Sequence, residues 1–181
     1  MGHDPLKKRK IAVLGARSVV VQFVEGHFVE SYYPTIENTF TKSIKFKNTE
    51  YDCDIIDTAG QDEYSILNNK HAIGIHGYIL VYSVASLVSF DMIQIIHDKI
   101  LTYSGTQTIP CVIVGQKKDL VNARQVPTAE AQKLAARLGC AFIETSARDN
   151  VNVADAFDMC LSQIEQSTNP SPDNPSRCVI M

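Results

Sequence analysis

Residues 57–61, Asp-Thr-Ala-Gly-Gln, close a run of apolar residues with groups that can act on a phosphate. The Asp57 carboxylate can hold a magnesium ion through a water molecule, and the Gly60 backbone can approach a terminal phosphate. The Gln61 amide can orient a water molecule for attack on that phosphate. The alternative interpretation of this segment is a plain strand-to-loop turn with a capping aspartate.

Two further segments suit the other end of a nucleotide. Residues 115–119 read Gly-Gln-Lys-Lys-Asp after a second apolar run, and residues 146–148 read Ser-Ala-Arg after a third. The Asp119 carboxylate can accept two N–H bonds from guanine, which adenine cannot supply. An amide followed three residues later by a carboxylate therefore predicts recognition of a purine edge.

The elements that must position these residues alternate along the chain. Apolar runs typical of strands cover residues 11–14, 39–47, 50–56, 77–83, 111–114 and 141–143, and the second and third of these flank a turn as a β-hairpin. Helical periods place apolar residues on one face at Phe90, Ile93, Ile96 or His97, and Ile100; at Ala131, Leu134, Ala135 and Leu138, ended by Gly139; and at Val153, Phe157, Leu161 and Ile164.

This alternation predicts an α/β sheet with helices on both faces. Ligands of such sheets bind at the carboxyl ends of the strands. Gly15, Asp57, Gly115 and Ser146 all follow strand ends, so we expect one composite site.

Composition bounds the class of protein. The chain has 181 residues, 45% of them hydrophobic and 20% charged, which is typical of one soluble globular domain. A formal charge of -3 gives no reason to expect nucleic acid as a partner. The basic run at residues 7–10 stands directly before the first expected strand; we interpret it as a solvated flank, with contact to a membrane surface as the alternative.

Cysteine and histidine usage adds two exclusions. The five cysteines lack Cys-x-x-Cys spacing and fit a reducing cytosol, with Cys53, Cys111 and Cys160 expected as small core residues. The scattered histidines argue against a transition-metal site. No apolar run is long enough to span a membrane.

In their order, these segments resemble the guanine-nucleotide boxes of the small GTPases of the Ras superfamily. Residues 32–40, Tyr-Tyr-Pro-Thr-Ile-Glu-Asn-Thr-Phe, resemble the first switch, and with Gln-Phe-Val-Glu-Gly before them and Gln-Asp-Glu-Tyr-Ser after them they are especially similar to the Rheb branch. The resemblance covers about residues 10–166 and resumes at the last four residues. It implies a three-layer P-loop NTPase fold, α/β, with a six-stranded mixed sheet flanked by about five helices.

The resemblance also assigns roles. Gln61 is the implied catalytic residue, and Arg17 beside it is expected to limit intrinsic hydrolysis. Magnesium is assigned to Thr35 and Asp57. The residues implied for GTP binding are Gly15, Arg17, Ser18, Val19, Tyr32, Thr35, Gly60, Gln116, Lys117, Asp119, Ser146 and Ala147, where the backbone N–H of Ala147 meets the guanine carbonyl.

Two of these positions depart from the family pattern. Gln116 stands where the family has Asn, which keeps the amide but moves it one methylene further out, so we expect weakened base recognition. Arg148 stands where the family has Lys.

The phosphate loop departs further. A P-loop reads Gly-x-x-x-x-Gly-Lys-Ser/Thr between a strand and a helix. Here Gly15 begins it, but Val20, Val21 and Gln22 occupy the Gly, Lys and Ser places, and alignment with the Rheb pattern removes five residues resembling Gly-Lys-Ser-Ser-Leu after Val19. The loss removes a phosphate-binding lysine, a magnesium-binding hydroxyl and several backbone donors, and it shortens the first helix.

Two explanations of this gap stay open. One is a segment lost from the recorded sequence at a misjudged exon edge. The other is a pseudo-GTPase, a non-enzymatic binding module that presents its effector segment without nucleotide. A flavodoxin-like binder unrelated to GTPases is a third, weaker alternative, because no other phosphate loop is visible.

The chain therefore divides into a Ras-like GTP-binding domain, residues 1–166, and a flexible tail, residues 167–181. The tail ends in Cys-Val-Ile-Met, a C-a-a-X motif that predicts farnesylation of Cys178 by a prenyltransferase. The resemblance implies a GTP/GDP switch that requires magnesium and signals to the TOR kinase complex. It also implies a GTPase-activating protein of the tuberous-sclerosis type as negative regulator, and a cytoplasmic location on the cytosolic face of membranes through the lipid.

Overall fold

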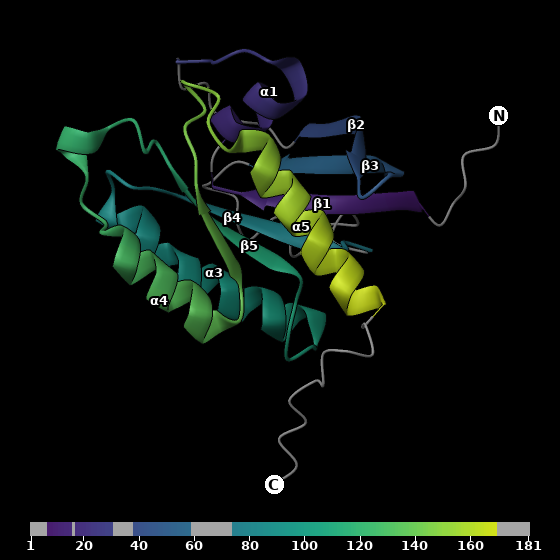
Figure 1. Cartoon of the computed structure of the whole chain (residues 1–181). Coiled ribbons are helices and arrows are strands. Elements are labelled where there is room, and N and C mark those ends of the chain that lie inside the picture. The colour runs from purple at the N-terminus through teal and green to yellow at the C-terminus, as the bar shows by residue number, and fades with distance from the viewer. Residues whose placement is uncertain (1–6, 16, 31–37, 59–73, 170–181) are drawn as a thin grey trace, which may run out of the picture.

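A six-stranded sheet forms the middle layer of the molecule (Figure 1). The structure, a computed structural model, describes residues 7–15, 17–30, 38–58 and 74–169. Its strands are β1 (Lys8–Leu14), β2 (Asn38–Phe46), β3 (Thr49–Thr58), β4 (Gly77–Ser83), β5 (Cys111–Gln116) and β6 (Ala141–Glu144), in the order β2-β3-β1-β4-β5-β6. Only β2, the edge strand of the predicted hairpin, runs antiparallel to its neighbour. The predicted mixed six-stranded sheet is confirmed.

Helices cover both faces of this sheet (Figure 1). They are α1 (Arg17–Glu25), α3 (Leu87–Ser104), α4 (Thr128–Leu138) and α5 (Val153–Thr168), with a 3-10 turn η3 (Val121–Ala123). Among the described residues there are thus four α-helices where about five were expected. The first of them has 9 residues, in line with the expected shortening, and the last extends to Thr168, past the end of the periodic pattern.

The boundaries of these helices follow from local chemistry. The Ser86 side chain caps α3 by accepting a hydrogen bond from the Ser89 N–H at 3.3 Å. Gly139 ends α4 as predicted, in the left-handed conformation with φ of 70°, where a side chain would be strained.

Two apolar cores lie on the two faces of the sheet. In β1, Ile11 and Val13 pack toward α1 and α5, whereas Ala12 and Leu14 pack toward α3 and α4, the alternation expected of a strand. The shortened α1 still contributes to its core, because Phe23 stacks on Phe157 of α5 with 3.8 Å between ring centroids. The expected apolar helix faces are confirmed by the buried residues of α3, α4 and α5.

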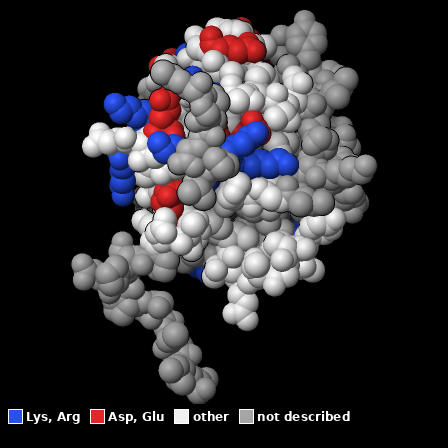
Figure 2. All heavy atoms as spheres, turned by 90° about the vertical axis from the view of Figure 1, so that its right-hand side faces the viewer, with Lys and Arg blue, Asp and Glu red and all other residues white. Residues whose placement is uncertain are grey.

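The basic run at residues 7–10, expected to precede the first strand, lies mostly within it. Residues 8–10 belong to β1, and Arg9 donates two hydrogen bonds to Glu165 of α5, at 2.8 and 3.0 Å, while its guanidinium lies over the Tyr51 ring. Lys8 pairs with Asp54 at 3.3 Å. Figure 2 shows this side of the molecule, where basic side chains lie among acidic ones. The run therefore belongs to the strand from residue 8 onward; Lys7 and Lys8 are exposed, as expected of a solvated flank, whereas Arg9 is held against the fold.

Candidate functional site

The carboxyl ends of five parallel strands meet at one edge of the sheet, and buried polar side chains gather there. The residues concerned are Asp57, Thr58, Gln116, Thr145 and Ser146, each at most 3% exposed. Burying polar groups costs free energy unless they are hydrogen-bonded, so such a group of residues marks a site. The positions expected to form one composite site thus lie at the same end of the sheet.

Asp119 and Ser146 form the half of the site that was assigned to the base. The Ser146 hydroxyl donates to Asp119 Oδ1 at 2.8 Å and accepts from the Asp149 N–H at 3.1 Å. Backbone bonds between Ser146 and Val151, at 3.0 and 2.9 Å, close the turn that holds Ala147. One carboxylate oxygen of Asp119 is therefore fixed by its neighbour, and the group is oriented before any ligand binds.

The segment that carries Asp119 is tied to the segment that carries Ser146. The Lys118 N–H donates to the Thr145 carbonyl at 3.1 Å, and the Thr145 N–H donates to the Gly115 carbonyl at 2.8 Å. Lys117 adopts the left-handed conformation, with φ of 66°, which is uncommon outside glycine and is typical of functional turns. The structure therefore brings Gln116, Lys117, Asp119, Ser146 and Ala147 together, as predicted.

Gln116 reaches across to the first helix. Its amide nitrogen donates a hydrogen bond to the Ser18 hydroxyl in the first turn of α1. The extra methylene relative to asparagine, which we expected to displace the bonds that brace this loop, here lets the amide contact a residue 98 positions away. The base half and the phosphate half of the site are joined by this bond.

Gly15 forms the turn between β1 and α1. Its φ of 114° disfavours side chains, and a Cβ there would lie 2.2 Å from the Val81 carbonyl oxygen of β4. Val19 is fully buried, so of this residue only the backbone can face a phosphate. Ser18 and Val19, which were assigned to the phosphate loop, lie in the first turn of α1, in a sequence that lacks the Gly-Lys-Ser of a complete P-loop.

Asp57 occupies the end of β3, opposite Val13 of β1 and Asn38 of β2, and its side chain is fully buried. Beside it the Thr58 hydroxyl donates to the Val13 carbonyl at 3.0 Å. Three strand spacings, about 14 Å, separate β3 from β5, and Asp57 is level with Val112, four residues before Gln116 along β5. The carboxylate end and the amide end therefore stand apart, as the two ends of an extended ligand require.

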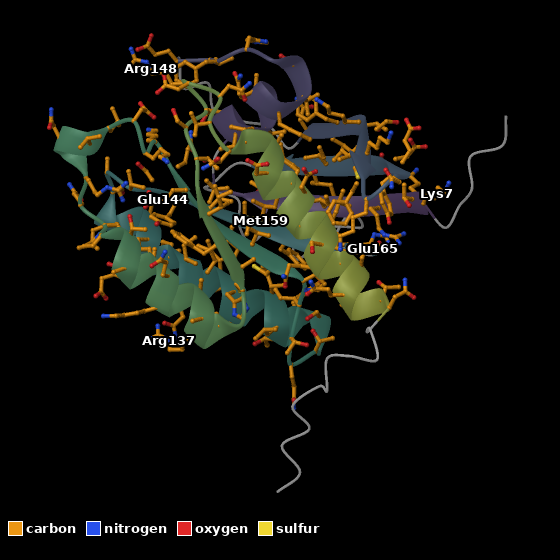
Figure 3. The ribbon with its side chains drawn as sticks, in the orientation of Figure 1. Lys7, Arg137, Glu144, Arg148, Met159 and Glu165 are labelled. Carbon is orange, nitrogen blue, oxygen red and sulfur yellow. The ribbon has the colours of Figure 1, made fainter. Side chains whose placement is uncertain are left out.

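A brace beneath the base half was not predicted. Arg124 donates to both carboxylate oxygens of Glu144, at 2.7 and 3.0 Å, and the Thr128 hydroxyl adds a third bond at 2.8 Å. Burial alone would raise the pKa of Glu144, but the bonds from Arg124 and Thr128 outweigh it and hold this pKa below its ordinary value. Figure 3 shows Glu144 near the end of β6, from which the chain continues toward Arg148. An acidic residue ending an apolar strand was the only sequence signal for it.

Several predicted residues lie outside the described part of the chain. These are Tyr32, Thr35, Gly60, Gln61 and Cys178. Their assignments remain predictions.

Comparison with known proteins decides the family. The model of the Ras family matches residues 11–166. The chain belongs to the Ras family. It is 58% identical to "GTP-binding protein rhb1" of Schizosaccharomyces pombe, over 97% of this chain and 98% of that protein. It is 56% identical to "Small monomeric GTPase RhbA" of Aspergillus fumigatus, over 97% of each, and 47% identical to "GTP-binding protein Rheb" of Homo sapiens, over 97% of this chain and 98% of the human one.

These relatives confirm the Rheb branch that the switch segments predicted. Membership of the family implies binding of a guanine nucleotide, in agreement with the base half of the site. The pseudo-GTPase alternative finds no support among them, since the relatives named above are called GTP-binding proteins or a GTPase.

Proposed function

We propose that the chain is a magnesium-dependent GTP/GDP switch that hydrolyses GTP to GDP and phosphate and signals to the TOR kinase complex from the cytosolic face of membranes. The observation that carries the proposal is the preformed base half of the site. Asp119, held by Ser146, has acceptor capacity left for the two adjacent N–H groups of guanine. Ala147, in the same turn, would supply a backbone N–H to the guanine carbonyl.

Magnesium fits the other end of the site. The Asp57 carboxylate ends β3 at the site edge and offers the oxygen donors that this ion prefers. It would hold the ion together with Thr35, and the ion would neutralise charge on the phosphates. Gln61 would orient the attacking water, with Gly60 close to the terminal phosphate.

The phosphates are the weak point of the site. Residues 11–41 contain no lysine, and Arg17 is the only strong cation among them. Three or four charge-assisted hydrogen bonds are absent relative to a complete P-loop, and at 1.5–3 kcal/mol each they total about 5–10 kcal/mol. This corresponds to about four to seven decades of affinity. The chain as it stands should therefore bind nucleotide weakly, through its base half.

The test restores the phosphate-binding groups. Insertion of Gly-Lys-Ser-Ser-Leu between Val19 and Val20 should raise the affinity for GDP, measured by titration with a fluorescent GDP in magnesium buffer, by at least about four decades. The matched control inserts Gly-Ala-Ala-Ser-Leu, which has the same length without the lysine and the first hydroxyl, and should recover only a small part of this gain. An inserted chain that does not bind GDP would refute the proposal, and micromolar binding by the chain as it stands would refute the estimated deficit.

Membrane attachment forms the second part of the proposal. In the described parts of the chain, no helix has both the length and the apolar character needed to cross a bilayer. A farnesyl group on Cys178, added by a prenyltransferase, would give marginal and reversible binding, because one lipid chain without a polybasic partner is a weak anchor. A GTPase-activating protein of the tuberous-sclerosis type would act on the GTP-bound state.

Membrane pelleting tests this part. Cys178→Ser should move the protein from partial membrane association to the soluble fraction when both are expressed in eukaryotic cells. Cys140→Ser serves as the control, since it also removes one cysteine but leaves the C-a-a-X motif intact. Equal partitioning of Cys178→Ser and the unaltered chain would contradict the lipid anchor.

A further inference from the structure

Two cysteines and a histidine meet at the edge of the sheet opposite to the nucleotide site. Cys111 begins β5, and Cys140 immediately precedes β6. These strands are parallel, with Val112 opposite Ala141, so the two cysteines occupy the next pair of opposed positions. Neighbouring strands lie about 4.8 Å apart, within the Cα separation of roughly 4.4–6.8 Å that a disulfide requires.

The distance from the nucleotide site is visible in Figure 3. Arg137, in the last turn of α4 just before Cys140, lies at the opposite end of the molecule from Arg148, which follows Ser146. Whatever chemistry the cysteines have is therefore separate from guanine binding.

The two thiols have unequal surroundings. Cys111 is fully buried in the core beneath α3 and α4, whereas Cys140 is only partly buried. The Cys140 thiol donates a hydrogen bond to the Leu138 carbonyl oxygen at 3.7 Å, and the Cys140 backbone N–H donates to the Ala135 carbonyl at 2.9 Å. Of the two thiols, Cys140 is thus the one that a small solute can reach.

His97 of α3 completes the cluster. His97 is 4% exposed and its side chain lies beside Cys140, and its Nδ1 lies 3.7 Å from Asp98 Oδ1. The Cys111 side chain lies next to that of Cys140, as their opposed positions at the starts of β5 and β6 lead one to expect. A thiol and a histidine thus lie beside one partly exposed sulfur, surroundings that favour its thiolate form.

The ionisation of the cluster follows from these contacts. The hydrogen bond from Cys111 is the main cause that lowers the pKa of Cys140 below its ordinary value; burial opposes it, and the hydrogen bond and charge of His97 assist it. The bond to Cys140 raises the pKa of His97, with a smaller contribution from Asp98. The same contact, together with burial, raises the pKa of Cys111. Among the described residues, the ionisable groups that bear on Cys140 are thus Cys111 of β5 and His97 of α3, the latter backed by Asp98.

We propose that Cys140 is a peroxide-reactive cysteine and that Cys111 is its resolving partner, so that oxidation joins β5 to β6 by a disulfide. The Cys140 thiolate attacks one oxygen of a hydroperoxide, the O–O bond breaks, and the leaving hydroxide or alkoxide takes a proton from His97. Cys140 becomes a sulfenic acid and the peroxide is reduced to water or alcohol. The Cys111 sulfur then attacks the Cys140 sulfur, the S–O bond breaks, and the hydroxyl leaves as water with the Cys111 proton.

The other face of the sheet provides an internal comparison. Cys53 and Cys160 share the core beneath α1 and α5, and both are fully buried. Burial raises the pKa of Cys53 to about 12 and that of Cys160 further still. Without a histidine or access to solvent, they should remain reduced under conditions that oxidise Cys140.

The experiment uses the full chain with Cys178→Ser, which removes the tail cysteine. The reduced protein is treated with stoichiometric hydrogen peroxide, alkylated, and mapped by peptide mass spectrometry. We expect a Cys111–Cys140 crosslink that dithiothreitol reverses, with Cys53 and Cys160 alkylated. In Cys111→Ala the reaction should stop at the sulfenic acid, seen as a dimedone adduct on Cys140.

The pH dependence of the oxidation rate tests the role of His97. In the unaltered cluster the midpoint should lie below the value of about 8.5 for a free cysteine, and in His97→Asn it should move up toward that value. Equal reactivity of Cys140, Cys53 and Cys160 would overturn the proposal, and so would oxidation of Cys140 without a crosslink in the chain that retains Cys111. Neither of these results requires a core variant to fold.

Discussion

Replacing Asp119 by asparagine is the sharpest test of the base half of the site. The substitution keeps size and shape, and the amide oxygen can still accept the hydrogen bond that the Ser146 hydroxyl donates at 2.8 Å. The loop should therefore keep its conformation, tied by the bond from the Lys118 N–H to the Thr145 carbonyl. What changes is the charge and the second oxygen, which becomes a donor.

The size of the effect follows from the two hydrogen bonds that we propose between this carboxylate and the base. Two guanine N–H groups would no longer meet a charged acceptor, and at about 1.5–3 kcal/mol each the loss is about 3–6 kcal/mol. This is about two to four decades of affinity for GDP. Xanthine carries a carbonyl where guanine has its amino group, so the new amide donor of Asp119→Asn should favour xanthosine diphosphate.

The assay is competition for a fluorescent nucleotide, carried out in the chain with the five-residue insertion so that binding is strong enough to measure. GDP affinity should fall and xanthosine diphosphate affinity should rise, reversing their order. Asp149→Asn is the matched control, because Asp149 contacts Ser146 only through its backbone N–H in the bond described, and it should change neither affinity. Equal loss of both nucleotides in Asp119→Asn would refute the reasoning that this carboxylate reads the base.

Two further predictions concern stability. Gly15→Ala should lower the free energy of unfolding by about 2–3 kcal/mol more than Gly26→Ala. Both glycines have a positive φ, but only at Gly15 would a Cβ meet the Val81 backbone. Chemical denaturation of the two variants measures the difference, and equal losses would contradict the close approach of Gly15 to Val81. Because folding lowers the pKa of Glu144, its carboxylate stabilises the protein above the pKa of the unfolded state, and this stability is lost as the pH falls through the pKa of the folded state. The fall in melting temperature between about pH 5 and pH 3 should therefore be smaller in Glu144→Gln. Identical profiles of the two proteins would count against the stabilising bonds from Arg124.

The layout of the sheet could be predicted because each strand contains a run of apolar residues that is visible in the sequence. All six strands were expected at the right places, but several are longer than their apolar parts. β1 begins at Lys8 because Arg9 is paired with Glu165 and lies over Tyr51, contacts that no local pattern contains. Likewise β3 continues to Thr58, whose hydroxyl is bonded inside the fold to the Val13 carbonyl.

Those features of the site that depend on residue type and motif spacing could be predicted from the sequence. Those that depend on contacts between distant parts of the chain could not. The pairing of Asp119 with Ser146 agrees with the motif spacing, since they follow the ends of two neighbouring parallel strands, β5 and β6. The bond from Gln116 to Ser18 depends on where a shortened helix starts, which sequence alone does not give. The helical period left Ile96 and His97 open as alternatives, and the structure buries both, which places His97 beside Cys140.

The pair of hydrogen bonds from Arg9 to Glu165, here called the fork, has a mechanical consequence. Glu165 lies in the last turns of α5, the helix that precedes the tail proposed to carry the lipid, and Arg9 lies near the start of the central strand that leads to Gly15. Tension applied to the chain end by an anchored lipid would be borne first by this fork and then by the hydrogen-bonded ladder of β1. The strand would act as a stiff rod of about 20 Å between the point of tethering and the turn at Gly15.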